Sequence, residues 1–181
     1  MDDERPAGEV ELPDLWMRDA EMTEFLEHPK FAAIASLRKT GTPLCVPVGF
    51  IWDGTGLMFS TACGRGLERR LRRDPRACAT IYNHSYPVAY VLMEGDALAV
   101  ADPDYEISLR IMRRYMTPGS PTQTMDDLDV ESFARNYISN GRTLFRLEPT
   151  RLVSYDSSKR GGAREVERLA AYGASEKLRK G

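Results

Sequence analysis

A cluster of arginines follows a Ser-Thr pair near the middle of the chain. Between residues 63 and 76 the sequence carries Arg65, Arg69, Arg70, Arg72, Arg73 and Arg76. Guanidinium groups bind phosphate oxygens in pairs, and the start of a helix adds unpaired N–H groups and a positive dipole end. Gly64 and Gly66 would let that backbone approach a ligand closely. The pattern predicts a site for a small anionic group, formed by Ser60, Thr61, Arg65, Arg69 and Arg70.

Two other interpretations of the basic cluster exist. Arg65 and Arg69 lie four residues apart and would share one face of a helix, which could simply be a solvated surface. A nucleic-acid surface would show aromatic residues interleaved with basic ones, in a chain that is basic as a whole. This chain has a net charge of −2. We therefore expect a small-molecule ligand and no nucleic-acid partner.

A second unusual segment is the apolar run that contains Pro47, Val48 and Gly49. In an extended strand, Val46, Val48 and Phe50 would share one face. Pro47 and Gly49 on the other face would leave the backbone open, because neither carries a bulky side chain there. This segment is either a platform for a flat ligand or an edge strand with a bulge.

Residues for acid–base or metal chemistry are sparse. His28 and His84 are the two histidines, and neither belongs to a Ser-His-Asp set or to a group with metal-ligand spacing. The three cysteines, Cys45, Cys63 and Cys78, form no C-x-x-C pair, so we expect neither a disulfide framework nor a zinc site. Cys45 and Cys78 lie in apolar runs and are predicted to be small core residues. We assign no catalytic residue and no metal.

Length and composition indicate one domain with extensions. The chain has 181 residues, 42% of them hydrophobic and 29% charged. No apolar stretch approaches the ~20 residues that a membrane span requires, and the acidic N-terminal region lacks a signal-peptide core. We expect a cytoplasmic protein without a membrane partner. The predicted division is an arm over 1–19, a domain over 20–156 and a basic tail over 157–181.

Periodicity and turn signals predict six strands with peripheral helices. Asp53-Gly54 is a hairpin signal, and Gly95 inside a long strand indicates a bulge. The expected strands cover 31–37, 44–52, 57–61, 76–82, 88–100 and 143–149, the last continued by 151–155. The expected helices cover 20–27, 64–73, 103–115, 130–138 and 164–172. The segment 116–129 is expected to be a long polar loop. Tight turns between early strands favour a small antiparallel barrel, so the fold class is mainly β with peripheral helices (α+β).

Several motifs in this order resemble the pyridoxamine 5′-phosphate oxidase-like superfamily, and more narrowly its flavin/deazaflavin oxidoreductases. They are FAAIASLRKTGTPLCVPVGFIWDGTGLMFST, LRRDPRACATIY, VLMEGDALAV and RTLFRLEPTRLVSYD. Each motif is short, but together they span about residues 22–156. The resemblance implies a six-stranded split β-barrel of the FMN-binding type and a homodimer with a cofactor at the subunit interface.

The resemblance also implies a cofactor site. The phosphate would lie near Ser60, Thr61 and the start of the following helix, and the ring would lie along Pro47, Val48 and Gly49. Relatives usually carry a Lys four residues before the Leu of this helix and an Asn just before that Leu, where this chain has Leu67 and Arg70. The arginine-rich replacement suits the longer anionic tail of the deazaflavin F420 better than the lone phosphate of FMN.

The expected function is therefore a flavin- or F420-dependent oxidoreductase. It would move a hydride between the cofactor, F420 or FMN, and a small organic substrate. The alternative is a non-catalytic module that binds or senses a flavin or haem on the same fold.

Overall fold

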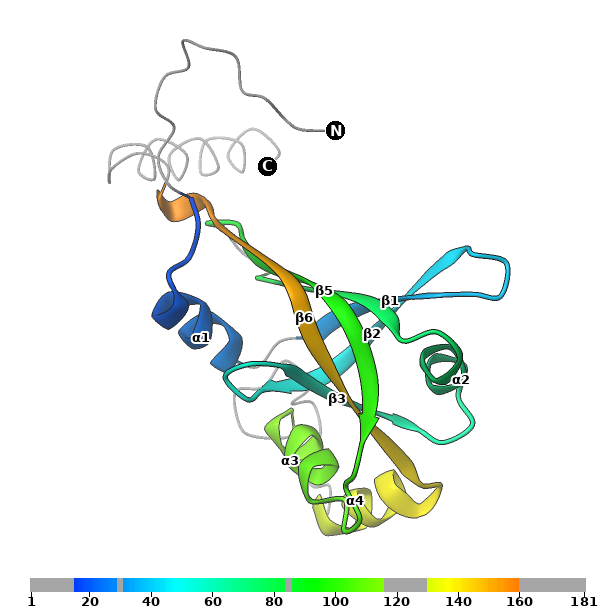
Figure 1. Ribbon diagram of the computed structural model, residues 1–181. Helices are drawn as coiled ribbons and strands as arrows, with labels where there is room; N and C mark the ends of the chain where they lie inside the picture. Colours follow the sequence, from blue (N-terminus) through cyan, green and yellow to red (C-terminus); the bar gives the residue numbers. More distant parts are fainter. Residues whose placement is uncertain (1–14, 29–30, 84–85, 116–129, 160–181) are drawn as a thin grey trace, which may run out of the picture.

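Six antiparallel strands close into a barrel in the computed structural model, which describes residues 15–28, 31–83, 86–115 and 130–159 (Figure 1). The strands are β1 (Phe31–Leu37), β2 (Pro43–Trp52), β3 (Leu57–Ala62), β4 (Arg76–Tyr82), β5 (Ala89–Val100) and β6 (Arg142–Asp156). Around the barrel they follow the order β1-β2-β3-β6-β5-β4. The predicted fold class is confirmed.

Four helices and one short 3₁₀ turn complete the described part of the chain. They are α1 (Asp19–Glu27), α2 (Gly66–Arg73), α3 (Glu106–Arg114), α4 (Val130–Ser139) and η1 (Ser157–Lys159). The helices lie outside the barrel, with α3 and α4 together at one end and α2 beside β1 (Figure 1). Met22 and Leu26 of α1 contribute to the main hydrophobic core.

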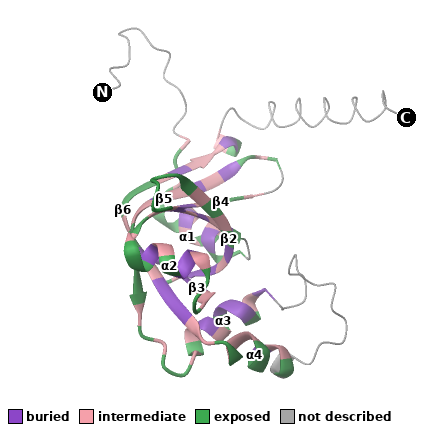
Figure 2. Cartoon of the chain, turned by 90° about the vertical axis from the view of Figure 1, so that its right-hand side faces the viewer, coloured by how far each residue is buried: buried purple, intermediate pink, exposed green. Residues whose placement is uncertain are grey.

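Alternating burial along the strands builds the core. Phe50, Phe59 and Phe145 are fully buried, and the rings of Phe59 and Phe145 stack with centroids 5.8 Å apart. Figure 2 shows buried residues within the strands of the barrel and in helices α2 and α3. Burying aromatic side chains of this size contributes a large share of the hydrophobic stabilisation.

Most predicted boundaries are correct within one or two residues, but the start of one helix differs. The sixth strand and its continuation form one strand, β6. Helix α3 begins at Glu106 and not at Pro103, because Tyr105 adopts a left-handed conformation with φ 56°. Asp102 still caps this helix, since its carboxylate accepts the N–H groups of Ile107 and Ser108 at 3.1 and 2.9 Å.

The prediction that Cys45 and Cys78 are core residues is wrong. Cys45 is exposed and Cys78 is only half-buried. Both lie in strands, and in a strand every second side chain points away from the core even within an apolar run. Burial raises the pKa of the Cys78 thiol.

The chain before α1 packs along β6. Asp156 donates its N–H to the carbonyl of Leu15 at 2.8 Å, and Met17 N–H donates to Ser154 Oγ at 2.8 Å. The division at residues 19 and 156 stays a prediction. The expected loop over 116–129, the helix over 164–172 and His84 lie outside the described residues. Among the described helices, none has the length and apolar character to cross a membrane.

Asp53 fixes the β2–β3 hairpin, and this predicts an acid-sensitive contribution to stability. Burial alone would raise the pKa of Asp53, but hydrogen bonds from Arg146, Thr55 and Gly56 lower this pKa from 3.8 to about 2. Because the pKa is lower in the folded state, Asp53 stabilises the fold at pH values above its ordinary pKa. This contribution to stability disappears as the pH falls from about 4 to about 2.

We expect Asp53→Asn to lower the free energy of unfolding by about 1 kcal/mol at neutral pH and to lose less stability on acidification than the wild type. Urea unfolding at pH ~7 and ~3 measures both effects. Glu94→Gln is the matched control, because its pair with Arg151 is exposed and 3.5 Å long. Parallel acid dependence of wild type and Asp53→Asn would refute the assignment.

Candidate functional site

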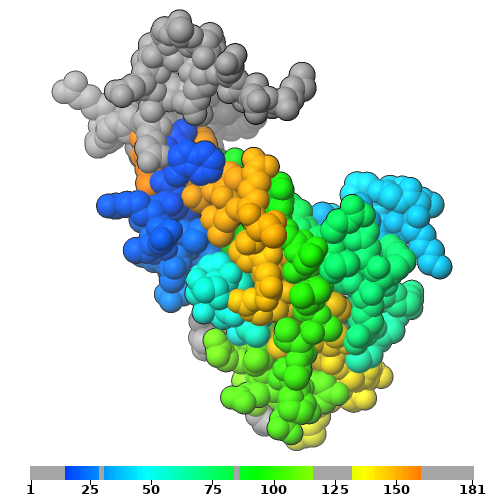
Figure 3. Space-filling view, in the orientation of Figure 1, coloured from blue at the N-terminus to red at the C-terminus, as the bar shows by residue number. Residues whose placement is uncertain are grey.

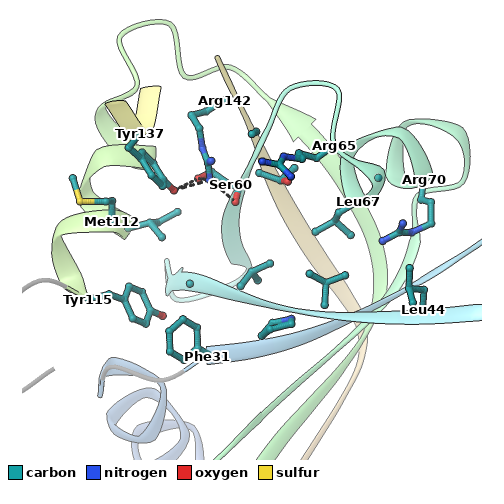
Figure 4. Close-up of a pocket in the computed structure, with 18 of the residues that line it drawn as sticks. Phe31, Leu44, Ser60, Arg65, Leu67, Arg70, Met112, Tyr115, Tyr137 and Arg142 are labelled. Atoms are coloured by element: carbon teal, nitrogen blue, oxygen red, sulfur yellow. Dashed lines mark hydrogen bonds between the residues drawn. The ribbon is translucent and has the colours of Figure 1, made fainter. Parts of the chain in front are cut away.

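A cavity lies where strands β2 and β3 diverge. The two strands pair only from Phe50↔Phe59 to Trp52↔Leu57. Beyond these pairs β2 stays paired with β1 and β3 stays paired with β6, so residues 43–49 and 60–62 leave a wedge between them. This wedge forms a cavity of about 770 Å³, lined also by Phe31 and by residues of α2, α3 and α4 (Figure 4).

The β2 side of the cavity is an exposed strand edge. On this side no described strand pairs with residues 43–49, so those backbone N–H and C=O groups that point away from β1 are available to a ligand. Pro47 lies within this stretch, which is where a strand tolerates a residue without an N–H. Pro47, Val48 and Gly49 all line the cavity.

Tyr115 determines the shape of one end of this edge. The β1 ladder ends at the Phe31↔Gly49 pair, and the Tyr115 hydroxyl then bonds the N–H and C=O of Phe50 at 2.9 and 3.3 Å. The Tyr115 ring stacks on Phe31 with centroids 5.0 Å apart. A Cβ at Gly49 would lie 2.7 Å from Tyr115 Cε2, so only glycine allows this approach. With Ile111 and Met112, these rings make an apolar end of the cavity.

A hydrogen-bonded cluster of Ser60, Tyr137 and Arg142 forms a polar wall nearby (Figure 4). The Ser60 and Tyr137 hydroxyls lie 2.7 Å apart. Arg142 Nη2 donates to Tyr137 Oη at 2.8 Å, to Ser60 O at 3.0 Å and to Ser60 Oγ at 3.1 Å. The guanidinium carbon also lies 3.9 Å from the Tyr137 ring centroid. The contacts fix the orientation of Arg142 across the strand ends.

Arg142 is a half-buried cation without a carboxylate partner among the described residues. All its acceptors are neutral, and its Nε is buried with no hydrogen-bond partner. Burial lowers the pKa of Arg142, Tyr137 and Cys63 raise it, and repulsion from Arg65 lowers it further. Because both arginines line one cavity, an anion bound between them would relieve this repulsion.

The turn before α2 holds Arg65 at the cavity. Gly64 has a φ of 74°, which glycine adopts without strain, and Arg65 is the N-cap with ψ 159°. Glu68 is buried and accepts from Gly64 N at 2.6 Å, from Arg72 Nε at 2.8 Å and from Thr143 Oγ1 at 3.0 Å. These bonds, Arg72 foremost, lower the pKa of Glu68. The ionised carboxylate therefore ties the turn to α2 and β6.

The structure brings seven of the eight predicted cofactor-binding residues to this cavity. They are Pro47, Val48, Gly49, Ser60, Thr61, Arg65 and Arg70. Arg69 instead lines a neighbouring groove and donates to the carbonyl of Gly64. The expectation that Arg65 and Arg69 share a helix face is wrong, because Arg65 precedes the helix in an extended conformation. The binding role of all eight residues stays a prediction.

Sequence reasoning missed Phe31, Tyr115, Tyr137 and Arg142. All four line the cavity, yet they come from β1, the C-cap of α3, α4 and β6. Tyr137 and Arg142 follow Ser60 by 77 and 82 residues, so no local spacing connects them. The described residues contain no group of three His, Cys, Asp or Glu side chains that could hold a metal ion.

Several solved structures share the fold of this chain. A protein named F420 reductase has 25% sequence identity and a TM-score of 0.55, with 71% of this chain and 93% of that chain covered. A conserved hypothetical protein from Mycobacterium tuberculosis has 23% identity and a TM-score of 0.65, covering 83% of this chain and 96% of the other. A FAD-binding protein from Mesorhizobium loti has 15% identity and a TM-score of 0.53, covering 77% and 93%.

Among curated proteins, nothing matches the chain. The family model described as pyridoxamine 5′-phosphate oxidase matches residues 19–154, which include strands β1 to β5 and β6 up to Ser154. The last two structures above share the fold, and the family model covers most of the 181-residue chain. The chain therefore belongs to the pyridoxamine 5′-phosphate oxidase family and has its split-barrel fold.

Proposed function

We propose that the cavity binds a flavin-type cofactor, F420 or FMN, and that the protein is an oxidoreductase acting on a small organic substrate. The observation that carries the proposal is the polarity of the cavity. A free strand edge and apolar rings form one part, and arginines without carboxylate partners among the described residues, Arg65, Arg70 and Arg142, form another. A planar ring joined to a phosphate has the same two-part chemistry.

The ring is expected to lie against β2. Unpaired backbone groups over residues 43–49 alternate donors and acceptors, as does the polar edge of a flavin or deazaflavin ring. Phe31 and Tyr115 offer aromatic surface for the apolar part of the ring. Gly49 keeps the backbone accessible, because it adds no side chain between the strand and Tyr115.

The phosphate is expected to lie between β3 and the start of α2. Arg65, Ser60 and Thr61 line this part of the cavity, together with Arg142 from β6. Charged hydrogen bonds of this kind contribute about 1.5–3 kcal/mol each. The anion would also neutralise two guanidinium groups whose mutual repulsion lowers the pKa of Arg142.

The bound cofactor supplies hydride transfer, and the residues of the chain supply binding, orientation and exclusion of water. The apolar end beside Met112 and Tyr115 suits a small, conjugated organic substrate. The Tyr137 hydroxyl, held by Arg142, offers a polar contact that would orient it. We also expect the protein to form a homodimer with the cofactor at the subunit interface. Phe31 is an exposed aromatic residue beside the cavity, which agrees with an interface there. A cytoplasmic location stays a prediction.

Two single substitutions test the phosphate site. Arg65→Gln is expected to weaken F420 or FMN binding by about tenfold or more, because it removes a charged hydrogen-bond donor at the cavity. Arg69→Gln is the matched control from the same segment, since Arg69 does not line the cavity. FMN ends at its phosphate, so Arg69→Gln should change the dissociation constant of FMN by no more than about twofold. Fluorescence titration gives both dissociation constants.

If Arg65→Gln binds F420 and FMN with wild-type affinity, the phosphate does not lie beside Arg65. A cofactor that binds but is reduced by no hydride donor would favour the alternative function, a binding or sensing module.

A further inference from the structure

Two hydroxyl groups on the polar wall of the cavity share one hydrogen bond. Ser60 Oγ and Tyr137 Oη lie 2.7 Å apart, and each also accepts a hydrogen bond from Arg142 Nη2, at 3.1 and 2.8 Å. Arginine has no acceptor atom, so neither hydroxyl can donate its proton to Arg142. The contact between the two oxygens uses one of their two protons. Among the described residues nothing else accepts a hydrogen bond from either hydroxyl, so one donor is left over.

The surplus donor is available to a ligand in the cavity. Both residues line the cavity, and Ser60 is buried whereas Tyr137 is half-buried. When Ser60 donates to Tyr137, the Tyr137 oxygen accepts two hydrogen bonds, one from Ser60 and one from Arg142. Hydrogen bonds in a chain polarise one another, so these two strengthen the Tyr137 O–H as a donor. The cavity therefore presents a strengthened phenol donor to its ligand.

Tyr137 lies at the side of the cavity where the substrate is expected. It belongs to α4, which packs against α3 (Figures 1 and 3). In Figure 4, Tyr137 lies between Arg142 and Met112, and Arg65 lies on the other side of Arg142. Burial raises the pKa of Tyr115, and the proximity of Tyr137 raises it further. Because the cofactor phosphate is expected beside Arg65, the Tyr137 hydroxyl is left for the substrate at the apolar end.

We propose that the Tyr137 hydroxyl selects substrates with a hydrogen-bond acceptor oxygen, and that the substrate is a conjugated carbonyl compound; this assignment rests on the proposed function. A substrate without an acceptor would bury the surplus donor unpaired, which costs free energy. A carbonyl oxygen satisfies the donor, and the conjugated carbon skeleton fills the apolar end beside Met112 and Tyr115.

Reduction of a conjugated carbonyl places negative charge where this donor lies. A hydride that adds to the β-carbon forms a C–H bond with its two electrons, and the electrons of the conjugated system move onto the carbonyl oxygen, giving an enolate. The hydride comes from the reduced cofactor, which is oxidised, and the proton that completes the product comes from water. The hydrogen bond from Tyr137 strengthens as charge grows on the oxygen, so it lowers the barrier as well as binding the substrate.

The test uses cyclohex-2-enone labelled with ¹³C at its carbonyl carbon as the probe, and cyclohexene as the analogue without an acceptor oxygen. Tyr137→Phe removes the hydroxyl and keeps the ring that packs on Arg142. Tyr105→Phe is the matched control, because Tyr105 does not line the cavity. NMR of the protein loaded with F420 or FMN gives the carbonyl shift and both dissociation constants, and the urea midpoint shows whether each variant is folded.

The carbonyl carbon of the enone is expected to shift downfield on binding to wild type, as in a carbonyl that accepts a hydrogen bond. Tyr137→Phe should lose this shift, bind the enone about tenfold more weakly and reduce it at least about tenfold more slowly. Its affinities for cyclohexene, FMN and F420 should stay within about twofold of wild type, because none of them uses the hydroxyl. Tyr105→Phe should match wild type in every measurement.

A downfield shift that persists in Tyr137→Phe would overturn the proposal. So would a Tyr137→Phe variant that loses affinity for FMN and F420 but not for the enone, because the hydroxyl would then bind the phosphate. If wild type binds a cofactor but neither binds nor shifts the enone, the substrate class is wrong while the cofactor site stands. If neither cofactor binds to folded wild type, the proposed function fails as well.

Discussion

Gly95→Ala is expected to destabilise the barrel by about 3 kcal/mol or more. A Cβ at this position would lie 1.9 Å from the carbonyl oxygen of Glu148 and 3.2 Å from the Cα of Pro149. Both are backbone atoms of β6, so the clash is relieved only if β5 and β6 separate. The effect should appear as a lower urea midpoint.

The clash arises at the bulge that the sequence predicted at Gly95. Glu94 pairs with Arg151 and Gly95 pairs with Pro149, so Thr150 is the extra residue. Gly66→Ala is the matched control, because only the flexible Arg70 Nη1 lies near, at 3.0 Å, and Gly66 is helical. It should be neutral or stabilise α2 by up to about 1 kcal/mol. Equal stability of Gly95→Ala and wild type would contradict the packing of β5 against β6.

Arg142→Gln is expected to weaken cofactor binding by about 10- to 100-fold. Arg142 is a half-buried cation with neutral acceptors only, so an anion in the cavity gains more from it than from an exposed arginine. The affinity of Arg142→Lys should lie between those of wild type and Arg142→Gln, since a lysine keeps the charge but cannot reproduce the three donated bonds of Nη2. Titration with F420 and FMN measures the loss.

The control for this experiment is Arg151→Gln. Arg151 lies on the same strand, is largely exposed and pairs with Glu94 away from the cavity. The Arg151→Gln variant should bind F420 and FMN with the same affinity as wild type. Because Arg142 also holds Ser60 and Tyr137, the unfolding midpoint of each variant must be compared with wild type. A stable Arg142→Gln protein with unchanged affinity would show that the anion lies elsewhere.

The barrel was predictable because its strands are short and bounded by strong turn signals. Asp53-Gly54 lies between β2 and β3, Asp74-Pro75 lies between α2 and β4, and β1 and β4 have the expected bounds. The start of α3 was not predictable from Pro103, because the left-handed Tyr105 delays the helix while Asp102 still caps it. Local backbone geometry therefore overrode a correct capping signal.

The candidate site was predictable only where neighbouring residues form it. Ser60, Thr61 and Arg65 are close in sequence, and their pattern of hydroxyls and guanidinium indicated an anion site. Arg142 was missed because the pairing of β3 with β6 brings it to Ala62, which no sequence periodicity reveals. Arg69 was assigned to the cavity from helical spacing, and that spacing fails because the helix begins after Arg65.

Titration of the purified chain with F420 and with FMN, followed by absorbance and fluorescence, tests the central claim most directly. The predicted result is saturable binding of at least one cofactor, which excess inorganic phosphate weakens because it competes for Arg65 and Arg142. Failure of both cofactors to bind to a folded protein would contradict a flavin-type site between β2 and β3.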